Sequence, residues 1–396
     1  MKQLASSIIF ILSVYACTSI GQWNSLDNIP TESVSIEWNR QTKLLDTADY
    51  AVSRIVPLKL DSTMFIGHAD KIEFYDGYIF LMDKEYAKRI FVFDSLGNMS
   101  ACIGGLGRAK NEYLRGPSDF SIDRKKREVC VMEAESNKLI RYDFNGKVKS
   151  TRLITDYWPY SFSCLSDGKY AFSFRMMDNN SNTENCELIV RDTLCDIQER
   201  WRPLTTHQLF TKDYPFWNTD GHVFYIPNLS DTVFVFDADT IERKVHVDFK
   251  GHFLSPDDVY SLKKDGDYSI LGDKEGVVNS ICKYEENDYW LHIEYSTGVL
   301  FHYLKNKVTG KEYQGASLFD GIFPIQNICV DGKYLVCLVL GDDINILKQM
   351  ISKDSREIQT LYEKSNDIIK GMINGKQSLP TLLYIDINRK YDNKRK

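Results

Sequence analysis

The feature of this sequence that most restricts its fold is a strand pattern that returns about every 46 to 50 residues. In its clearest form, two short apolar strands are joined by a polar turn, and an aspartate after the second strand begins the next turn. Clear and looser copies lie at 78–94, 128–143, 222–237, 169–190, 289–303 and 333–338. Phe93 and Tyr142 hold equivalent positions and are 49 residues apart. The repeating unit is therefore longer than a single hairpin.

The composition of these segments identifies the kind of unit. Strands rich in Val, Ile, Phe and Tyr, bounded by Asp, Asn and Gly, are typical of paired strands with tight turns. Four strands in a unit of this length indicate a propeller blade, which buries its faces against neighbouring blades. Such packing can bury the aromatic side chains, which make up 13% of the residues. A β-sandwich, the alternative, lacks so long a period. We therefore predict an all-β fold, a six-bladed β-propeller with four-stranded blades and a helical insertion near the C-terminus.

The predicted propeller occupies residues 33–390. Its six blades are expected at 64–110, 111–156, 157–205, 206–252, 276–315 and 316–390. One N-terminal strand should join the last blade and close the ring, because closure removes exposed strand edges. The insertion is predicted at 342–374, where apolar residues follow helical spacing. Asp342 or Asp343 can cap its start, and we expect a break near 353–355. The helix either packs on one propeller face or docks a partner.

The first residues have the features of an export signal. Lys2 precedes an apolar run that ends at Ala16–Cys17 and is too short to span a bilayer of ~30 Å. Cys17 directly after Ala16 fits a bacterial lipobox, and plain cleavage nearby is the alternative. We expect a signal peptide at 1–16, acylation of Cys17, a polar tether at 17–32 and a basic tail at 391–396. These features predict a lipid-anchored protein of the cell envelope, on a membrane face that the sequence does not fix.

The net charge and the cysteines limit which partners and which disulfides are expected. The net charge of −6 argues against nucleic acid, whose binding requires basic patches. No later apolar run is long enough for a membrane-spanning helix. Several cysteines lie inside apolar strands, where a free thiol behaves as a small buried hydrophobe. Export permits disulfides, and Cys186 with Cys195 is the first pair to consider. We expect a monomer.

The stretch from Ile103 to Asp123 carries a family resemblance. It contains a Gly-rich turn, a cluster around Glu112 and Tyr113, then Pro117 and an apolar strand that ends in Asp. This stretch resembles the blade linker of bacterial six-bladed β-propeller lipoproteins, which are relatives of NHL-repeat propellers and many of which have no assigned function. The resemblance implies the propeller fold and the lipid anchor, and it says little about activity.

Two groups of residues are candidates for ligand binding. In the linker, the glycines and Pro117 have a structural explanation, since they allow the turn and the strand entrance. Aromatic stretches at 157–160 and 214–217 precede strand pairs, where loops line one propeller face. Flat rings near charged residues suit sugars or peptides, and packing between blades is the structural alternative. The candidate ligand-binding residues are Arg108, Glu112, Tyr113, Arg115, Trp158, Tyr160 and Trp217.

The sequence lacks the common catalytic motifs. It has no P-loop, no G-x-G-x-x-G after a strand, no H-E-x-x-H and no G-x-S-x-G. His292 and His302 fall on adjacent strands and could face each other as metal ligands. Two partly exposed strand histidines are the commoner arrangement, so we expect no metal site, and we identify no catalytic residue or cofactor.

Taken together, these patterns predict a membrane-anchored, non-enzymatic binding or scaffold protein for a carbohydrate, peptide or protein partner at the cell envelope. The alternative is an NHL-like propeller hydrolase or lyase with a metal in the central channel. That alternative requires several blades to supply His, Asp or Glu to one site.

Overall fold

The structure is a computed structural model of the chain. It describes residues 26–38, 44–45, 50–154, 159–174, 186–192, 197–203, 214–255, 257–258, 261, 276–318, 323–324, 327–352, 370–371, 374 and 379–387.

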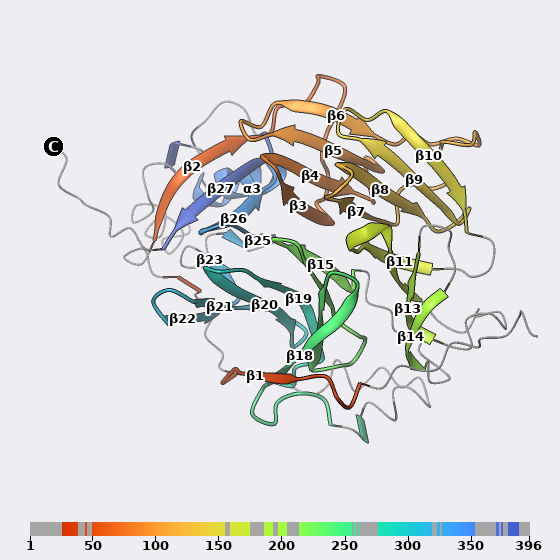
Figure 1. Cartoon of the computed structure of the whole chain (residues 1–396). Helices are drawn as coiled ribbons and strands as arrows, with labels where there is room; N and C mark the ends of the chain where they lie inside the picture. Colours follow the sequence, from red (N-terminus) through yellow and green to blue (C-terminus); the bar gives the residue numbers. More distant parts are fainter. Residues whose placement is uncertain are drawn as a thin grey trace, which may run out of the picture.

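Six antiparallel sheets stand around a common axis and form a ring of blades (Figure 1). Blade one is β3 (Lys71–Tyr75), β4 (Tyr78–Asp83), β5 (Arg89–Asp94) and β6 (Met99–Ile103); blade two is β7 (Asp119–Asp123), β8 (Glu128–Glu133), β9 (Lys138–Asp143) and β10 (Val148–Leu153); blade three is β11 (Pro159–Cys164), β12 (Tyr170–Phe174), β13 (Cys186–Arg191) and β14 (Ile197–Pro203). Blade four is β15 (Phe216–Thr219), β16 (His222–Tyr225), β17 (Thr232–Asp237) and β18 (Thr240–Asp248); blade five is β19 (Ser280–Glu286), β20 (Trp290–Ser296), β21 (Leu300–Asn306) and β22 (Glu312–Gly315); blade six is β25 (Ile328–Asp331), β26 (Tyr334–Val339), β27 (Thr381–Asp386) and β2 (Ala51–Pro57). A short pair, β23 (Ser317–Leu318) and β24 (Phe323–Pro324), lies between blades five and six in the chain. The predicted six-bladed propeller is confirmed.

Aspartates after the third strands form the turns that the repeat predicts. Asp94 accepts hydrogen bonds through Oδ1 from the backbone N–H groups of Leu96 and Asn98, each at 2.9 Å. Gly97 supplies the positive φ of +76° that this turn requires. Asp143 repeats the arrangement one blade later. The aspartate therefore recurs because its carboxylate satisfies the donors of a tight turn.

The core consists of six apolar clusters, one at each contact between neighbouring blades. Between blades one and two, for example, Phe80 and Val92 pack against Phe120 and Val131. Most strands are buried on both faces, so they read as continuous apolar runs and not as alternating ones. No blade shields its own faces, which explains why the units form a ring.

Strand β2 closes the ring, as predicted. It lies antiparallel to β27, with Val52 opposite Ile385 and Val56 opposite Leu382. The first N-terminal strand, β1 (Thr31–Ser35), was not expected to join a blade. It runs parallel to β18 and adds a fifth strand to blade four.

The structure shortens the tether expected at 17–32. Leu26 and Ile29 pack against the cluster between blades three and four, and Lys244 Nζ donates to the Leu26 carbonyl at 2.9 Å. Residues 26–32 are thus held on the ring by these apolar side chains and by the half-buried ammonium of Lys244. The predicted signal peptide at 1–16, Cys17 and the tail at 391–396 lie outside the described residues.

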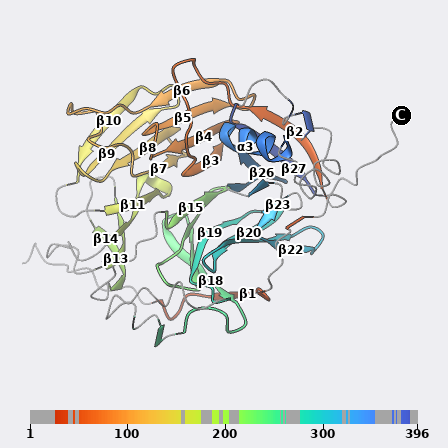
Figure 2. The ribbon, with the colours of Figure 1, turned by 180° about the vertical axis from the view of Figure 1, so that it is seen from behind.

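The predicted helical insertion begins with α3 (Gly341–Ser352), which stands in the foreground beside blade six in Figure 2. Asp343 does not cap the start as predicted: it lies inside the first turn, and its Oδ2 accepts from the backbone N–H of Leu340 at 3.2 Å, the back-reaching half of a capping box. The break predicted near 353–355 lies outside the described residues. None of the helices in the described part of the chain has the length and hydropathy of a membrane span.

In the described part of the chain six cysteines are free thiols, and three of them are buried in strands as expected: Cys130, Cys329 and Cys337. Cys195 lies outside the described residues, so its pairing with Cys186 stays a prediction.

The two ends of the blades carry very different connections. On one face, strands are joined by short turns such as 76–77, 95–98 and 220–221. The connections that leave and re-enter at the opposite face include 104–118, 249–279 and 340–380. We call this opposite side the long-loop face. Binding residues concentrate on loops that a rigid scaffold positions, so this face is where a ligand site is expected.

Candidate functional site

Residues from three blades meet around the axis on the long-loop face. Lys84 follows β4 in blade one, Tyr160 lies in β11 of blade three, and Tyr214 precedes β15 of blade four. Lys84 Nζ donates to the Tyr160 hydroxyl at 2.9 Å. The same ammonium lies 5.4 Å from the ring centroid of Tyr160 and 5.7 Å from that of Tyr214. Together with Asp70, which precedes β3, these residues form what we call the axial cluster.

Asp70 fixes the geometry of the axial cluster. Its Oδ1 accepts from the Tyr214 hydroxyl at 3.1 Å, and its Oδ2 accepts from the Lys84 backbone N–H at 2.8 Å. His68 Nδ1 lies 3.3 Å from Oδ2, and its side chain is 49% exposed. One carboxylate thus holds both the loop that carries Lys84 and the ring of Tyr214. The cluster presents two half-buried aromatic rings beside an ammonium group and a carboxylate.

Trp217 lies next to the axial cluster, in β15. It is buried, and its ring meets Tyr214 edge-on at a centroid distance of 6.5 Å. Lys283 Nζ of blade five lies 4.6 Å from the Trp217 ring centroid, a cation–π contact. The indole N–H of Trp217 is buried without a hydrogen-bond partner in the structure. Trp217 therefore supports the cluster from within the ring.

Buried charged groups line the axis beside this cluster. Lys71 Nζ donates to Asp119 Oδ1 at 2.9 Å and to the Phe120 carbonyl at 2.7 Å. It also pairs with Glu73 at 3.4 Å, and Asn218 Nδ2 donates to Glu73 at 2.9 Å. These residues come from the first strands of blades one, two and four. We call Lys71, Glu73, Asp119 and Asn218 the inner polar layer.

The inner polar layer carries its own counter-ions. Burial alone would lower the pKa of Lys71, but Asp119 and Glu73 outweigh it and raise the pKa above its usual value. Burial raises the pKa of Glu73, and Lys71 opposes this only in part. A second buried lysine, Lys283, pairs with Glu285 at 3.2 Å. A metal cation at the axis would face two ammonium groups, so these carboxylates suit a rigid polar core better than a channel metal.

The linker candidates divide into structural and exposed residues. Glu112 accepts from the Ala109 N–H at 2.8 Å and so closes the linker turn. Tyr113 is fully buried, and its hydroxyl hydrogen-bonds that of Tyr142 at 2.9 Å. Arg108 is exposed. The contacts of Glu112 and Tyr113 are thus internal to the linker and blade two, which is the structural role that the sequence left open.

The remaining candidates are Arg115, Trp158, Tyr160 and Trp217. Arg115 is exposed and pairs loosely with Glu135 at 3.7 Å. Trp158 lies outside the described residues. Of the seven candidates, Tyr160 belongs to the axial cluster and Trp217 lies beside it. Sequence reasoning missed Lys84 and Asp70, whose partners come from distant parts of the chain.

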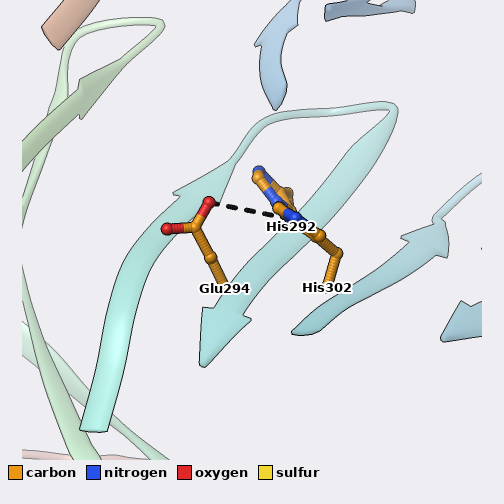
Figure 3. Close-up of side chains that lie close together, drawn as sticks. All are labelled: His292, Glu294 and His302. Carbon is orange, nitrogen blue, oxygen red and sulfur yellow. Dashed lines mark hydrogen bonds and ion pairs between the residues drawn. The ribbon is translucent and has the colours of Figure 1, made fainter. Parts of the chain in front are cut away.

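One group of side chains in blade five could hold a metal ion. His292 and Glu294 of β20 and His302 of β21 converge on one side of the sheet (Figure 3). The predicted facing of the two histidines is confirmed, since His292 Nε2 lies 3.1 Å from His302 Nδ1. The expectation that they are partly exposed is wrong, because both are fully buried. Burial lowers the pKa of both imidazoles, so both are neutral at pH 7.

A solved structure shares this fold. A candidate exported protein of Bacteroides fragilis superposes with a TM-score of 0.72 at 16% identity, over 91% of this chain and all of that one (100%). A member of the DUF4221 family from Bacteroides vulgatus gives a TM-score of 0.48 at 10% identity, over 85% of this chain and 97% of that one. At such identity the first likeness shows the fold alone. Comparison with curated proteins gives no significant match.

A family model settles the membership of the chain. The model of DUF4934, a domain of unknown function, matches residues 28–370. These residues include all six blades in large part, together with the axial cluster and α3. The relation to NHL-repeat propellers and the lipid anchor stay predictions. Because the match spans most of the sequence, the chain belongs to the DUF4934 family.

Proposed function

We propose that this protein is a non-enzymatic binding protein of the cell envelope that takes a carbohydrate at the axial cluster. The observation that carries the proposal is the convergence of Tyr160 and Tyr214 on one ammonium group, Lys84, at the axis of the long-loop face. The three residues come from three different blades, so the ring itself positions the site.

The chemistry of the cluster matches a sugar. Aromatic rings offer their faces to the C–H groups of a pyranose, and polar edges at the same place fix its hydroxyl groups. Lys84 Nζ can donate to such hydroxyls, and the Asp70 carboxylate can accept from them. Both polar groups are already oriented by hydrogen bonds within the cluster, which lowers the entropic cost of binding.

The same groups argue against sugar cleavage at this site. Most glycosidases use two carboxyl groups that flank the scissile bond, whereas Asp70 is the one carboxylate of the axial cluster among the residues that the structure describes. The carboxylates of the inner polar layer are engaged by Lys71. Binding is therefore favoured over hydrolysis or lysis.

Export and anchoring complete the proposal. The apolar N-terminal run that ends at Ala16–Cys17 supports secretion and acylation, and the similarity to a candidate exported protein agrees with it. Two or more acyl chains would give stable attachment to the membrane. The long-loop face would then meet its ligand in the envelope.

Glycan and peptide arrays probed with the purified protein test the ligand class, and calorimetry gives the affinity. We expect Tyr160→Ala and Lys84→Met to weaken the best glycan at least about 10-fold, the loss of one stacking or charge-assisted contact. Tyr289→Ala is the matched control, because Tyr289 is an exposed tyrosine (41%) in a short turn on the opposite face. Glycan affinity that is unchanged in both cluster variants, or binding to peptides alone, would refute the proposal.

A further inference from the structure

The polar group in blade five stands apart from the axial cluster and lies where β20 and β21 pair. Glu294 and His302 are directly opposite each other in the strand register. His292 lies two residues before Glu294, so its side chain points to the same side of β20. His302 Nδ1 lies 3.1 Å from His292 Nε2 and 3.7 Å from Glu294 Oε2. We call these three residues the blade-five cluster (Figure 3).

We propose that the blade-five cluster binds one divalent cation of the zinc type, with His292, Glu294 and His302 as ligands. Two imidazoles and a carboxylate are a donor set that zinc uses in proteins. Tetrahedral bonds of about 2.0–2.2 Å place neighbouring ligand atoms about 3.3–3.6 Å apart. The observed separations of 3.1 and 3.7 Å bracket this range, so small side-chain shifts complete the geometry.

A second carboxylate orients the first imidazole. Glu285 Oε2 lies 3.1 Å from His292 Nδ1, and Glu285 is in turn held by Lys283 at 3.2 Å. A carboxylate that accepts from the far nitrogen of a metal-binding histidine fixes the tautomer and raises the basicity of the ligand. In this arrangement the proton of His292 lies on Nδ1, and the lone pair of Nε2 faces the cluster.

The other imidazole has one nitrogen at the cluster and one without a partner. His302 is fully buried, yet its Nε2 has no hydrogen-bond partner in the structure. A buried polar atom without a partner costs about 1–3 kcal/mol, and a histidine in the middle of an apolar blade is expected to be satisfied. Neither tautomer of His302 satisfies both of its nitrogens with the contacts present. A cation in the blade-five cluster would bind Nδ1 of His302, the atom that faces His292 and Glu294, so Nε2 would keep the proton and the ligand distances carry the proposal.

Charge and access also suit a divalent cation. The groups that face the cluster are the carboxylates of Glu285 and Glu294 and the ammonium of Lys283, which is the register partner of Glu294 on β19. Their formal charges leave one net negative charge. Glu294 is 14% exposed, so the cation can enter beside it. His302 lies opposite Gly315 on β22, which places no side chain against it. Bound there, the cation would tie β20 to β21.

Metal content and affinity of the purified, chelator-treated full chain test this site. We expect uptake of one Zn²⁺ per chain, measured by elemental analysis and calorimetry. Glu294→Gln and His302→Gln should weaken Zn²⁺ binding at least about 100-fold, since each removes one direct ligand. His222→Gln is the control, because His222 is an exposed histidine on β16 of blade four.

The visible spectrum of the Co²⁺-loaded wild-type protein is a second readout that requires no variant. A four-coordinate nitrogen–oxygen site predicts intense ligand-field bands that saturate at one Co²⁺ per chain and disappear when Zn²⁺ is added. Wild-type protein that takes up no Zn²⁺, or that gives only the weak spectrum of six-coordinate Co²⁺, would overturn the proposal. Equal Zn²⁺ affinity in folded Glu294→Gln and wild-type protein would do the same.

Discussion

Replacing Lys71 by methionine tests the buried charges around the axis. Lys71 is fully buried, and its ammonium donates to Asp119 and to the Phe120 carbonyl while it also pairs with Glu73. Methionine keeps most of the side-chain volume but removes the ammonium group that contacts both buried carboxylates. Removal of one partner of a buried pair costs about 3–5 kcal/mol, because the remaining charge is desolvated and uncompensated. Asn218 still donates to Glu73 in the variant, so we expect Lys71→Met to lose about 3–4 kcal/mol.

Urea unfolding followed by tryptophan fluorescence measures this loss as a shift of the denaturation midpoint at constant slope. The double variant Lys71→Met/Asp119→Asn should recover at least half of the lost stability, since the amide removes one of the two uncompensated charges. Acid should also help the single variant: burial already holds the pKa of Glu73 above its usual value, and removal of Lys71, which opposes this shift, raises it further above about 4.3, the unfolded value of Glu. The folded state then binds protons that the unfolded state does not, so stability increases as the pH falls from 8 toward 5. A cost below about 1 kcal/mol, or strictly additive effects in the double variant, would refute this reasoning.

Two further predictions concern other parts of the ring. Burial would raise the pKa of Glu286, but Arg243 at 2.8 Å and a neighbouring lysine hold this pKa below its usual value. The ion pair therefore stabilises the protein above about pH 4.3, and this stabilisation is lost in acid. The urea midpoint of Glu286→Gln should differ most from that of wild type at pH 7, and an equal difference at pH 3 would contradict this. Gly104→Ala should lower stability by at least about 2 kcal/mol, because Gly104 has a φ of +101° and a Cβ there would lie 2.3 Å from the Tyr113 ring. Gly105→Ala is the control for thermal unfolding, since nothing lies within 4 Å of its Cβ position; equal melting temperatures of the two variants would show that the close approach is absent.

The fold was predictable because its determinants are local and repeated. Apolar runs buried on both faces, and aspartates such as Asp94 that satisfy a tight turn, appear in the sequence at a fixed period. Strand β1 was not predictable, since most of its residues are exposed and its partner β18 is more than two hundred positions away. Its attachment depends on a parallel edge that the sequence pattern does not mark.

The candidate site was only partly predictable, because its contacts join distant blades. Tyr160 could be singled out as an aromatic residue at a blade entrance, but its partner Lys84 is 76 positions away. Lys71 is the first residue of a strand, a position where a lysine is expected to be exposed to solvent. It is buried because it pairs with Asp119 of the next blade, 48 positions further along the chain. Tyr113 was a ligand-binding candidate, but its ring packs over Gly104, and a tyrosine in a glycine-rich linker does not indicate this packing.

A crystal structure of the protein with its tightest-binding glycan tests the central claim most directly. We predict a sugar ring within about 4 Å of the Tyr160 and Tyr214 rings, the distance of van der Waals contact, with hydroxyl groups hydrogen-bonded to Lys84 or Asp70. Glycan bound at the short turns of the opposite face, or at the outer edge of a blade with the axial cluster unchanged, would contradict the account.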